Sequence, residues 1–250
     1  MLNPFGTFWS LLRGRIDPDF YKISNLGSVN DLPIILIRPK RMKKDKRNIL
    51  IVSGFHGNEI AGPWSICRLL MNDKFKSYDS NVSIIPIVNP DGFENGTRYN
   101  HWNELSNQGF LNSQAVASHE GLVLLNNIEE LKELGSDGFL SVHENDRRKN
   151  FYLYVLAKKK PVELIKKISD VGKCVFGLQP DGTYEDEREG KYTVENGCVY
   201  NRHDDTFEDY MFSLGTPVSI VTETPSMDVP LKSRVTVNCD VIDQFLKGNF

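Results

Sequence analysis

The 250-residue sequence lacks the marks of several large protein classes. No apolar segment approaches the roughly 18 residues that suggest a membrane-spanning helix, and the amino-terminal stretch has neither the basic region nor the cleavage site of a signal peptide. The four cysteines include no CxxC pair, which excludes a zinc ribbon and a dithiol redox motif. We therefore expect reduced thiols, a cytoplasmic location and no association with a membrane.

An excess of charge of one sign is also missing. The formal net charge is −3, which gives no overall attraction to nucleic acid or to an anionic membrane. Seven basic residues do fall within residues 38–47, a pattern that would suit nucleic-acid binding or nuclear import. A solvated loop between two strands explains this run with fewer assumptions, so we predict no nucleic-acid partner.

The sequence shows no repeat and no low-complexity linker, so we expect a single domain over residues 1–250. Apolar, β-branched runs alternate with segments of helical periodicity, which indicates the α/β class. A helix is expected to start close to Glu59, and the "NPDG" sequence at 89–92 indicates a turn. The other predicted helices are 113–134, 161–174, 204–214 and 233–247, and the predicted strands are 32–37, 48–54, 82–88, 139–143, 151–156 and 218–224.

Two of the five histidines, His56 and His143, follow apolar strand-like runs. In open α/β sheets the carboxyl ends of the strands form the crevice in which ligands bind, so both imidazoles can converge there. Glu59 lies three residues after His56, across a tight glycine-containing turn, and its carboxylate can reach the same point. Two histidines and one glutamate form a catalytic zinc ligand set that leaves one coordination position open. A lone HxxE spacing also arises by chance, as two polar residues that share a loop.

Several further stretches resemble one family in the correct order. The zinc carboxypeptidase superfamily, which includes deacylases of the succinylglutamate desuccinylase and aspartoacylase type, is matched over about residues 48–228 by "GFHGNE", "NPDGFENGTRYN", "LSNQGF", "SVHEN" and "TETPS". The resemblance implies a single domain with a mixed, twisted sheet of about eight strands flanked by helices. The order of these motifs is more specific than any one of them.

The resemblance also implies roles for individual residues. His56, Glu59 and His143 would bind one Zn²⁺ ion, which lowers the pKa of a bound water from 15.7 to about 7. Arg98 would polarise the scissile carbonyl, and Glu223, at the end of a predicted strand, would act as the general base. The charges of zinc, Glu59, Arg98 and Glu223 sum to +1, which favours a carboxylate on the substrate.

One position departs from the family pattern. An asparagine and an arginine normally hold the substrate carboxylate, whereas this sequence has Asn107 followed by Gln108. Glutamine is uncharged, so a charge-assisted hydrogen bond of roughly 1.5–3 kcal/mol is lost. Either the substrate carries an amide or other polar group there, or another arginine substitutes; the candidates are Arg147, Arg148 and Arg202.

The family's peptidases also use a tyrosine between the third zinc ligand and the base. Three tyrosines, Tyr184, Tyr192 and Tyr200, lie in the polar segment 179–203, and the sequence selects none of them. The acidic cluster "YEDEREG" in this segment suggests a solvated loop that covers the site.

Three functions fit these observations. The first is a zinc-dependent metallopeptidase of carboxypeptidase type, which hydrolyses a carboxyl-terminal peptide or peptide-like bond. The second is an amidohydrolase that acts on N-acyl amino acids, favoured by the short interval between Glu59 and His143, whereas "NPDGFENGTRYN" and "TETPS" look closer to the peptidases. The third is a binding module that retains zinc without turnover, against which stands the expected base Glu223.

Overall fold

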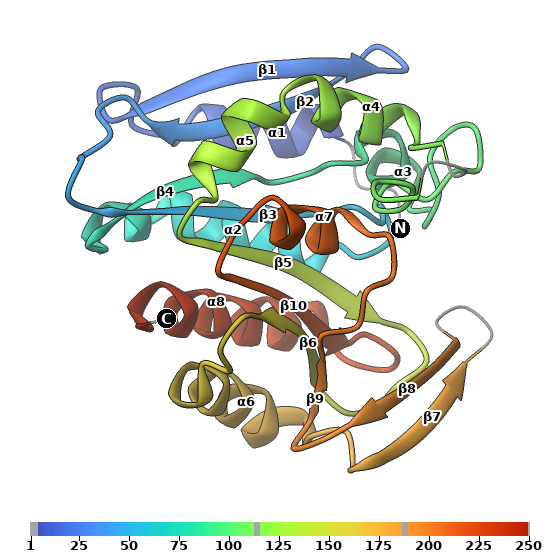
Figure 1. Cartoon of the computed structure of the whole chain (residues 1–250). Helices are drawn as coiled ribbons and strands as arrows, with labels where there is room; N and C mark the ends of the chain where they lie inside the picture. The colour runs from blue at the N-terminus through green and yellow to red at the C-terminus, as the bar shows by residue number, and fades with distance from the viewer. Residues whose placement is uncertain (1–4, 113–115, 187–189, 250) are drawn as a thin grey trace.

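Eight strands form one mixed sheet in the computed structural model of the chain, in the spatial order β1-β2-β4-β3-β5-β10-β6-β9 (Figure 1). The central strands β3, β5 and β10 run parallel, so their carboxyl ends lie at the same edge of the sheet. The strands are β1 Tyr21–Val29, β2 Leu32–Pro39, β3 Arg47–Ser53, β4 Ser80–Ile85, β5 Gly138–Asn145, β6 Tyr152–Ala157, β9 Cys198–Tyr200 and β10 Val218–Pro225. The structure describes residues 5–112, 116–186 and 190–249, without the side chain at 186.

Helices cover both faces of this sheet (Figure 1), which explains why the central strands are almost continuously buried. Buried side chains of α1, α2, α6 and α8 share one core with one face of the sheet, and those of α4, α5 and α7 share a second core with the other face. The helices are α1 Phe5–Arg13, α2 Ala61–Met71, α3 Pro90–Asn95, α4 His119–Asn126, α5 Ile128–Leu134, α6 Val162–Phe176, α7 Phe207–Ser213 and α8 Leu231–Lys247, with a 3₁₀ turn at Lys74–Ser77. The prediction of a single α/β domain with about eight strands is confirmed.

The single helix predicted over 113–134 is wrong. Residues 113–115 lie outside the described residues, and the remainder forms the two helices α4 and α5. Ser118 caps the start of α4, because its hydroxyl accepts a hydrogen bond from the Gly121 amide at 3.0 Å. Asn127 ends α4, since its side-chain amide donates to the Val123 carbonyl at 2.8 Å and also to the backbone of β1.

The turn expected at 89–92 is instead the start of the short helix α3. The Asn89 side chain accepts a hydrogen bond from the Gly92 amide at 2.7 Å, and Pro90 occupies the first helical position, where its missing N–H costs nothing. The preceding strand, predicted to reach residue 88, ends at Ile85, because Pro86 cannot donate a ladder hydrogen bond.

The polar segment 179–203, expected to be a solvated loop, contains regular structure. Strands β7 Gly182–Asp186 and β8 Gly190–Val194 pair antiparallel as a separate two-stranded sheet, and β9 then joins the edge of the main sheet. Part of the acidic cluster, residues 187–189, lies outside the described residues. This part of the segment is therefore a pair of strands rather than an irregular loop, and its role as a cover of the site stays a prediction.

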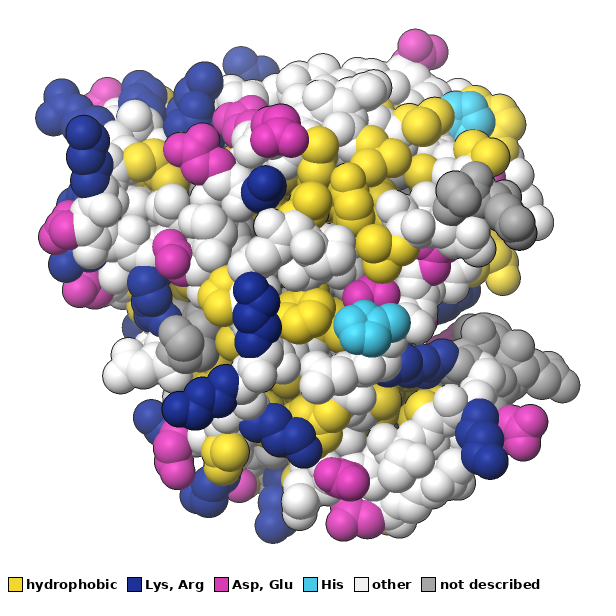
Figure 2. Space-filling view, in the orientation of Figure 1, with side chains coloured by type: hydrophobic (Ala, Val, Ile, Leu, Met, Phe, Trp, Pro, Cys, Tyr) yellow, Lys and Arg dark blue, Asp and Glu magenta, His cyan; other side chains and the backbone are white. Residues whose placement is uncertain are grey.

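Residues 40–46 of the basic run form the connection between β2 and β3, and the ends of the run belong to these strands. Figure 2 shows Lys and Arg side chains, interspersed with acidic ones, at the upper left, the side on which Figure 1 draws this connection. Two of its cations pair with acidic residues, Arg38 with Glu130 and Lys46 with Asp79. None of the described helices combines the length and apolarity needed to cross a membrane, and all four cysteines are free thiols.

Candidate active site

The turn between β3 and α2 brings His56 and Glu59 to the carboxyl edge of the sheet. The Glu59 amide donates to the His56 carbonyl at 3.1 Å, which closes the turn. Gly57 is required for this course, because a Cβ atom there would lie 1.9 Å from the backbone of Gly92 in α3. The chain can thus pass close to α3 only without a side chain at position 57.

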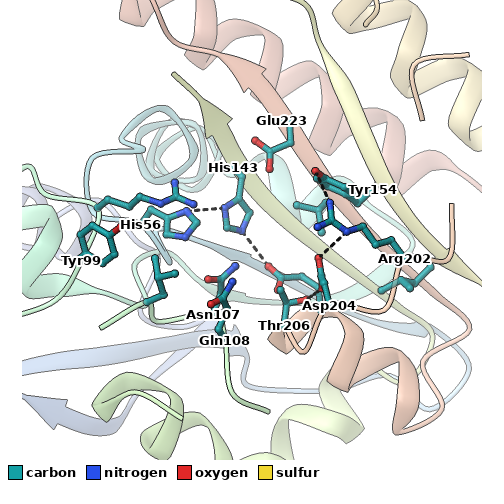
Figure 3. A pocket seen from close by; sticks show the side chains of 15 residues that line it. His56, Tyr99, Asn107, Gln108, His143, Tyr154, Arg202, Asp204, Thr206 and Glu223 are labelled. Atoms are coloured by element: carbon teal, nitrogen blue, oxygen red, sulfur yellow. Dashed lines mark hydrogen bonds and ion pairs between the residues drawn. The ribbon is translucent and has the colours of Figure 1, made fainter. Parts of the chain in front are cut away.

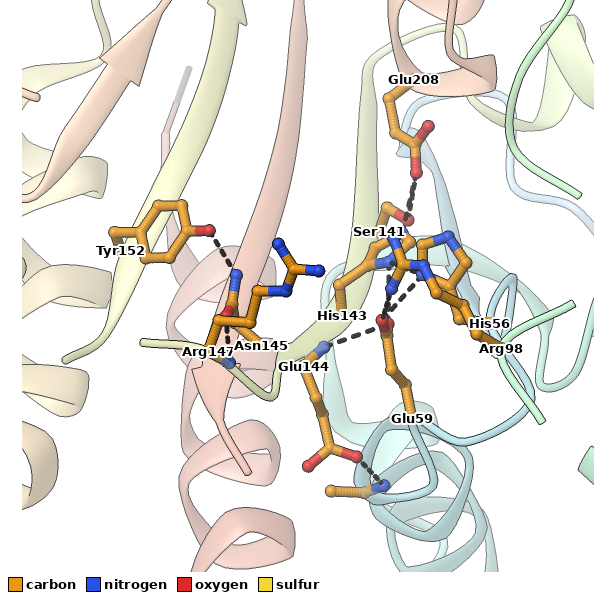
Figure 4. Close-up of polar contacts among 11 residues, drawn as sticks. His56, Glu59, Arg98, Ser141, His143, Glu144, Asn145, Arg147, Tyr152 and Glu208 are labelled. Carbon is orange, nitrogen blue, oxygen red and sulfur yellow. Dashed lines mark hydrogen bonds and ion pairs between the residues drawn. The ribbon is translucent and has the colours of Figure 1, made fainter. Parts of the chain in front are cut away.

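His143 completes the cluster from the end of β5 (Figure 4). Its Nδ1 lies 2.9 Å from Glu59 Oε2, and His56 Nδ1 lies 2.7 Å from Glu59 Oε1. The two Nδ1 atoms are 3.3 Å apart, and all three side chains are at least nine-tenths buried. Three potential ligand atoms from two separate segments therefore point at one small volume.

These donors fit a divalent metal ion. Ligand atoms held about 2.0–2.1 Å from a tetrahedral zinc ion lie roughly 3.3–3.5 Å from one another. The two Nδ1 atoms have this separation, at 3.3 Å, and Glu59 approaches the imidazoles more closely, at 2.7 and 2.9 Å. Among the described residues, His56, Glu59 and His143 form the group of metal-ligating side chains within 4.8 Å of one another. Two neutral imidazoles and one carboxylate are the donor set of catalytic zinc sites, in which water or substrate takes the remaining position.

The same proximity governs the protonation of these groups. Burial disfavours the charged form of Glu59, but the two imidazoles outweigh it and hold the pKa of Glu59 well below its ordinary value. Burial lowers the pKa of His56. Burial acts in the same direction on His143, yet two adjacent carboxylates raise the pKa of His143 well above its ordinary value. Without a metal ion the imidazolium form of His143, with a proton on each ring nitrogen, is thus favoured, and metal binding at Nδ1 must displace the proton there.

Arg98 and Glu223, assigned to catalysis from the sequence, both lie beside this cluster. Arg98, on the loop after α3, donates through Nη1 to Glu59 Oε1 at 2.9 Å. Glu223 is the Cα partner of His143 in the parallel pairing of β10 with β5. Both side chains line the same cavity as His56 and His143, so the structure brings the five predicted residues together.

The cavity that opens in front of the cluster has a volume of about 410 Å³. Asn107 and Gln108 line it from the loop before α4, and the Gln108 backbone pairs with that of Thr206 (Figure 3). Aliphatic side chains of the sheet contribute an apolar part of the wall, from Leu156 and Val221. In Figure 2 the surface is hollowed between the main body and the β7–β8 hairpin.

The three candidate replacement arginines lie in different places. Arg202 lines the main cavity, with its guanidinium 3.4 Å from the Tyr154 hydroxyl and 4.0 Å from the Asp204 carboxylate (Figure 3). Arg147 lines a smaller pocket beside Glu59 and Glu223. The guanidinium of Arg148 lies 5.2 Å from the ring of a tyrosine in β7.

The tyrosines of the cavity are not those expected. Its described lining includes Tyr99 and Tyr154, whereas Tyr184 and Tyr192 stack on each other at a centroid distance of 5.8 Å. The third expected tyrosine, Tyr200, has the Lys160 ammonium 3.8 Å from its ring centroid. Segment 179–203 therefore contributes an arginine to the cavity, Arg202, rather than one of these three tyrosines.

Glu208, on α7, was missed in the sequence. Its Oε1 lies 3.0 Å from His143 Nε2 and accepts a hydrogen bond from the Ser141 hydroxyl at 2.6 Å. A carboxylate inside a short helix carries no spacing that relates it to a strand end far along the chain, so no local pattern marks it. The charges of zinc, Glu59, Arg98 and Glu223 were predicted to sum to +1, and the negative charge of Glu208 lowers this sum to zero.

Two comparisons with known proteins show which family this chain resembles. Residues 45–148 match the family described as the succinylglutamate desuccinylase/aspartoacylase catalytic domain, a range that contains the three clustered residues and Arg98. The crystal structure of a candidate metallopeptidase from Shewanella denitrificans is 30% identical in sequence, with a TM-score of 0.86, over 96% of this chain and 88% of that one. This chain belongs to the zinc carboxypeptidase-like superfamily.

Other members of the superfamily differ in how much of this chain they match. A candidate metallopeptidase structure from Shewanella baltica is 30% identical, with a TM-score of 0.88, over 97% of this chain and 91% of that one. A metallo-carboxypeptidase from Burkholderia cenocepacia is 16% identical with a TM-score of 0.68, over 97% of this chain and 67% of that one, a likeness of fold. A candidate aspartoacylase from Prochlorococcus marinus is 44% identical over 54 residues, which span 21% of this chain and 18% of that protein.

Proposed function

We propose that this superfamily member is a zinc-dependent metallopeptidase of carboxypeptidase type, which hydrolyses a carboxyl-terminal peptide or peptide-like amide bond. The observation that carries the proposal is the convergence of His56, Glu59 and His143 at one end of a cavity that Glu223 also lines. A site built only to hold a metal closes its coordination with a fourth protein ligand, whereas this cluster faces a cavity.

His56, Glu59 and His143 would hold a zinc ion, which would supply Lewis-acid activation of water and of the scissile carbonyl. The role of Glu223 is to take a proton from the attacking water and return it to the leaving nitrogen. Its place in β10 beside His143 sets the distance between base and metal ligand through the spacing of neighbouring strands. Arg98 donates to the carbonyl oxygen as negative charge develops on it, and loss of such a donor typically costs about 10²–10³ in rate.

Binding of the substrate is assigned to Asn107, Gln108 and Arg98, with Arg202 supplying the charge that Gln108 lacks. Of the three arginines considered, Arg202 is the one that lines the main cavity together with both amide side chains. Its guanidinium lies 4.0 Å from the Asp204 carboxylate and 3.4 Å from the Tyr154 hydroxyl, and a substrate carboxylate in the same cavity can form a charge-assisted hydrogen bond with it.

The second candidate function is hydrolysis of N-acyl amino acids. It is supported by the match of residues 45–148 to the desuccinylase/aspartoacylase domain, whereas the relatives that match nearly the whole chain are candidate metallopeptidases. A cavity of about 410 Å³ suits a small acyl amino acid or the last residues of a peptide. The cytoplasmic location predicted from the sequence belongs to this proposal as well.

The test compares the zinc-loaded wild type with a Glu223→Gln variant on peptides and on N-acyl amino acids in parallel, with a chelated control. We expect the variant to retain zinc and to lose about 10²–10⁴-fold in kcat, because it lacks the base. A Glu133→Gln variant, which changes an exposed carboxylate of α5, serves as the matched control.

The substrate panel separates the candidate functions. Cleavage of acyl amino acids alone would end the peptidase proposal in favour of the amidohydrolase. Zinc binding by wild type and variant, with no hydrolysis of either substrate class by the wild type, would favour the binding module.

A further inference from the structure

Glu208 is a buried carboxylate that the proposed reaction does not use. It is 1% exposed, although it lies on a short helix that leads into β10. Its Oε1 accepts two hydrogen bonds, from the Ser141 hydroxyl at 2.6 Å and from His143 Nε2 at 3.0 Å (Figure 4). A buried charged group is costly unless it is paired, and the second oxygen of this carboxylate, Oε2, has no hydrogen-bond partner among the described residues. The two contacts at Oε1 therefore call for a functional explanation.

Three interactions fix the position of Glu208. Thr206 caps α7, its hydroxyl accepting from a helix amide at 3.3 Å. Phe207 is fully buried and packs against Phe55 and Phe139, with ring centroids 5.9 and 5.7 Å away. The Ser219 hydroxyl of β10 donates to the Glu208 carbonyl at 2.9 Å. Glu208 is therefore held by two neighbouring strands: β5 bonds its carboxylate through Ser141 and His143, and β10 bonds its backbone carbonyl through Ser219.

The contact with His143 determines how the imidazole is protonated. A carboxylate can only accept a hydrogen bond, so the proton of this contact is on Nε2. A neutral His143 then has its lone pair on Nδ1, the atom that lies 2.9 Å from Glu59 and 3.3 Å from His56 Nδ1. Phe55 stacks on the ring at 5.8 Å with planes 6° apart, so it sets the plane while Glu208 sets the direction within it.

We propose that Glu208 is a positioning residue that holds His143 in the Nε2–H tautomer, with Nδ1 directed at the metal position. The inference rests on the proposed function, since it assumes that the cluster binds a divalent ion. Hydrogen bonds from metal-bound histidines to carboxylates orient the ring and raise its basicity, and their loss typically weakens metal binding about 10- to 100-fold.

His56 does not share this support. Its Nε2 is buried and has no hydrogen-bond partner within the described part of the chain, so Nδ1 and its contact with Glu59 are what orient that ring. The two histidines are thus held differently. Among the described residues, Glu208 is the carboxylate outside the ligand set that contacts one of these two rings, and its loss removes that contact.

The experiment measures zinc affinity at neutral pH, by competition with a chromophoric chelator, for the wild type, Glu208→Gln, Glu208→Ala and Ser141→Ala. We expect Glu208→Ala to bind zinc about 10- to 100-fold more weakly. Glu208→Gln should lie between it and the wild type, because the amide oxygen still accepts from Nε2 but carries no charge. Ser141→Ala keeps the carboxylate and should bind within a few-fold of the wild type.

Two controls separate positioning from folding. Glu120→Gln changes another fully buried carboxylate, one bonded to Asn100 and Ser106, and should leave zinc affinity unchanged. The absorption spectrum of the cobalt-substituted protein should shift in Glu208→Ala but not in Glu120→Gln, since it reports the geometry of the ligands. If Glu208→Ala does not fold, the Gln and Ser141 variants still rank the contribution of charge and orientation.

The outcomes distinguish this inference from the function on which it rests. A wild type that binds zinc with the same affinity and cobalt spectrum as Glu208→Gln and Glu208→Ala would overturn the positioning role alone. A wild type that binds no divalent metal would overturn both proposals. A zinc-binding wild type without hydrolysis would remove the enzyme function, while a weakened Glu208 variant would still support the positioning role.

Discussion

A single methyl group at position 57 should greatly weaken metal binding in a chain that still folds. In Gly57→Ala the new Cβ would lie 1.9 Å from the carbonyl carbon of Gly92 and 2.2 Å from the Phe93 nitrogen, whereas ordinary contacts begin at 3.4 Å. Both partners are backbone atoms that cannot rotate away, so the turn or α3 must move by about 1.5 Å. Metal ligands tolerate displacements of only about 0.2 Å, so the ligand set formed by His56 and Glu59 would no longer match that of His143.

Overpacking of this kind typically costs about 1–3 kcal/mol, which corresponds to roughly 2–12 °C in Tm for a chain of this size. We therefore expect Gly57→Ala to unfold cooperatively at a lower temperature and to lose zinc affinity by at least about 100-fold, measured by calorimetry and chelator competition. The matched control is Gly6→Ala in α1, where a Cβ meets nothing within 4 Å. Wild-type zinc affinity in Gly57→Ala would refute the claim that the close approach of these loops builds the ligand set.

Three further predictions address substrate, pH and metal. Arg202→Met should raise KM roughly 10- to 150-fold for substrates with a free carboxylate but not for their amide-capped analogues, measured in steady-state assays. An equal rise in KM for the two kinds of substrate would contradict the assignment of Arg202 to carboxylate binding. Burial raises the pKa of Glu120, so the stability linked to this group is fully present below its unfolded pKa and is lost as pH rises through the folded value. Denaturant titrations of the wild type and Glu120→Gln across that range should converge at low pH and diverge at neutral pH in favour of the variant. Removal of zinc supplied at about 100 times its Kd should lower stability by about 2.7 kcal/mol, or roughly 5–10 °C in Tm, and a scan unaffected by chelator would count against a site in the folded state.

The sequence was most informative where a residue's position follows from strand direction. His56, His143 and Glu223 each stand at or just beyond the end of an apolar run, and parallel strands bring such ends to one edge. Glu59 follows from its spacing in the turn. These placements need only the polarity of the central strands, which the alternation of strands and helices already indicates.

Residues that reach the site by tertiary packing were harder to predict. Glu208 depends on where α7 lies over the sheet, and that is decided by how Phe207 fits among aromatic side chains from distant segments. Arg202 was one of three equivalent arginines in the sequence, and only the course of the chain after β9 places it in the cavity. Local capping decided the other differences, as at Ser118 and Asn89, where a side-chain hydrogen bond to the backbone fixed a helix start that periodicity misplaced.

The pairing of His143 with Glu223 across two neighbouring strands has a consequence for how such a protein can change. The separation of the proposed metal ligand from the proposed base is a property of the sheet ladder, whereas Asn107, Gln108 and Arg202 lie on the segments that connect its elements. Loops can be lengthened, exchanged or recombined at little cost to the ladder, so substrate preference can change while the proposed metal ligands and base keep their places. An engineer who wished to redirect this protein would therefore leave the central strands alone and build libraries in the two loop segments around 105–110 and 201–206.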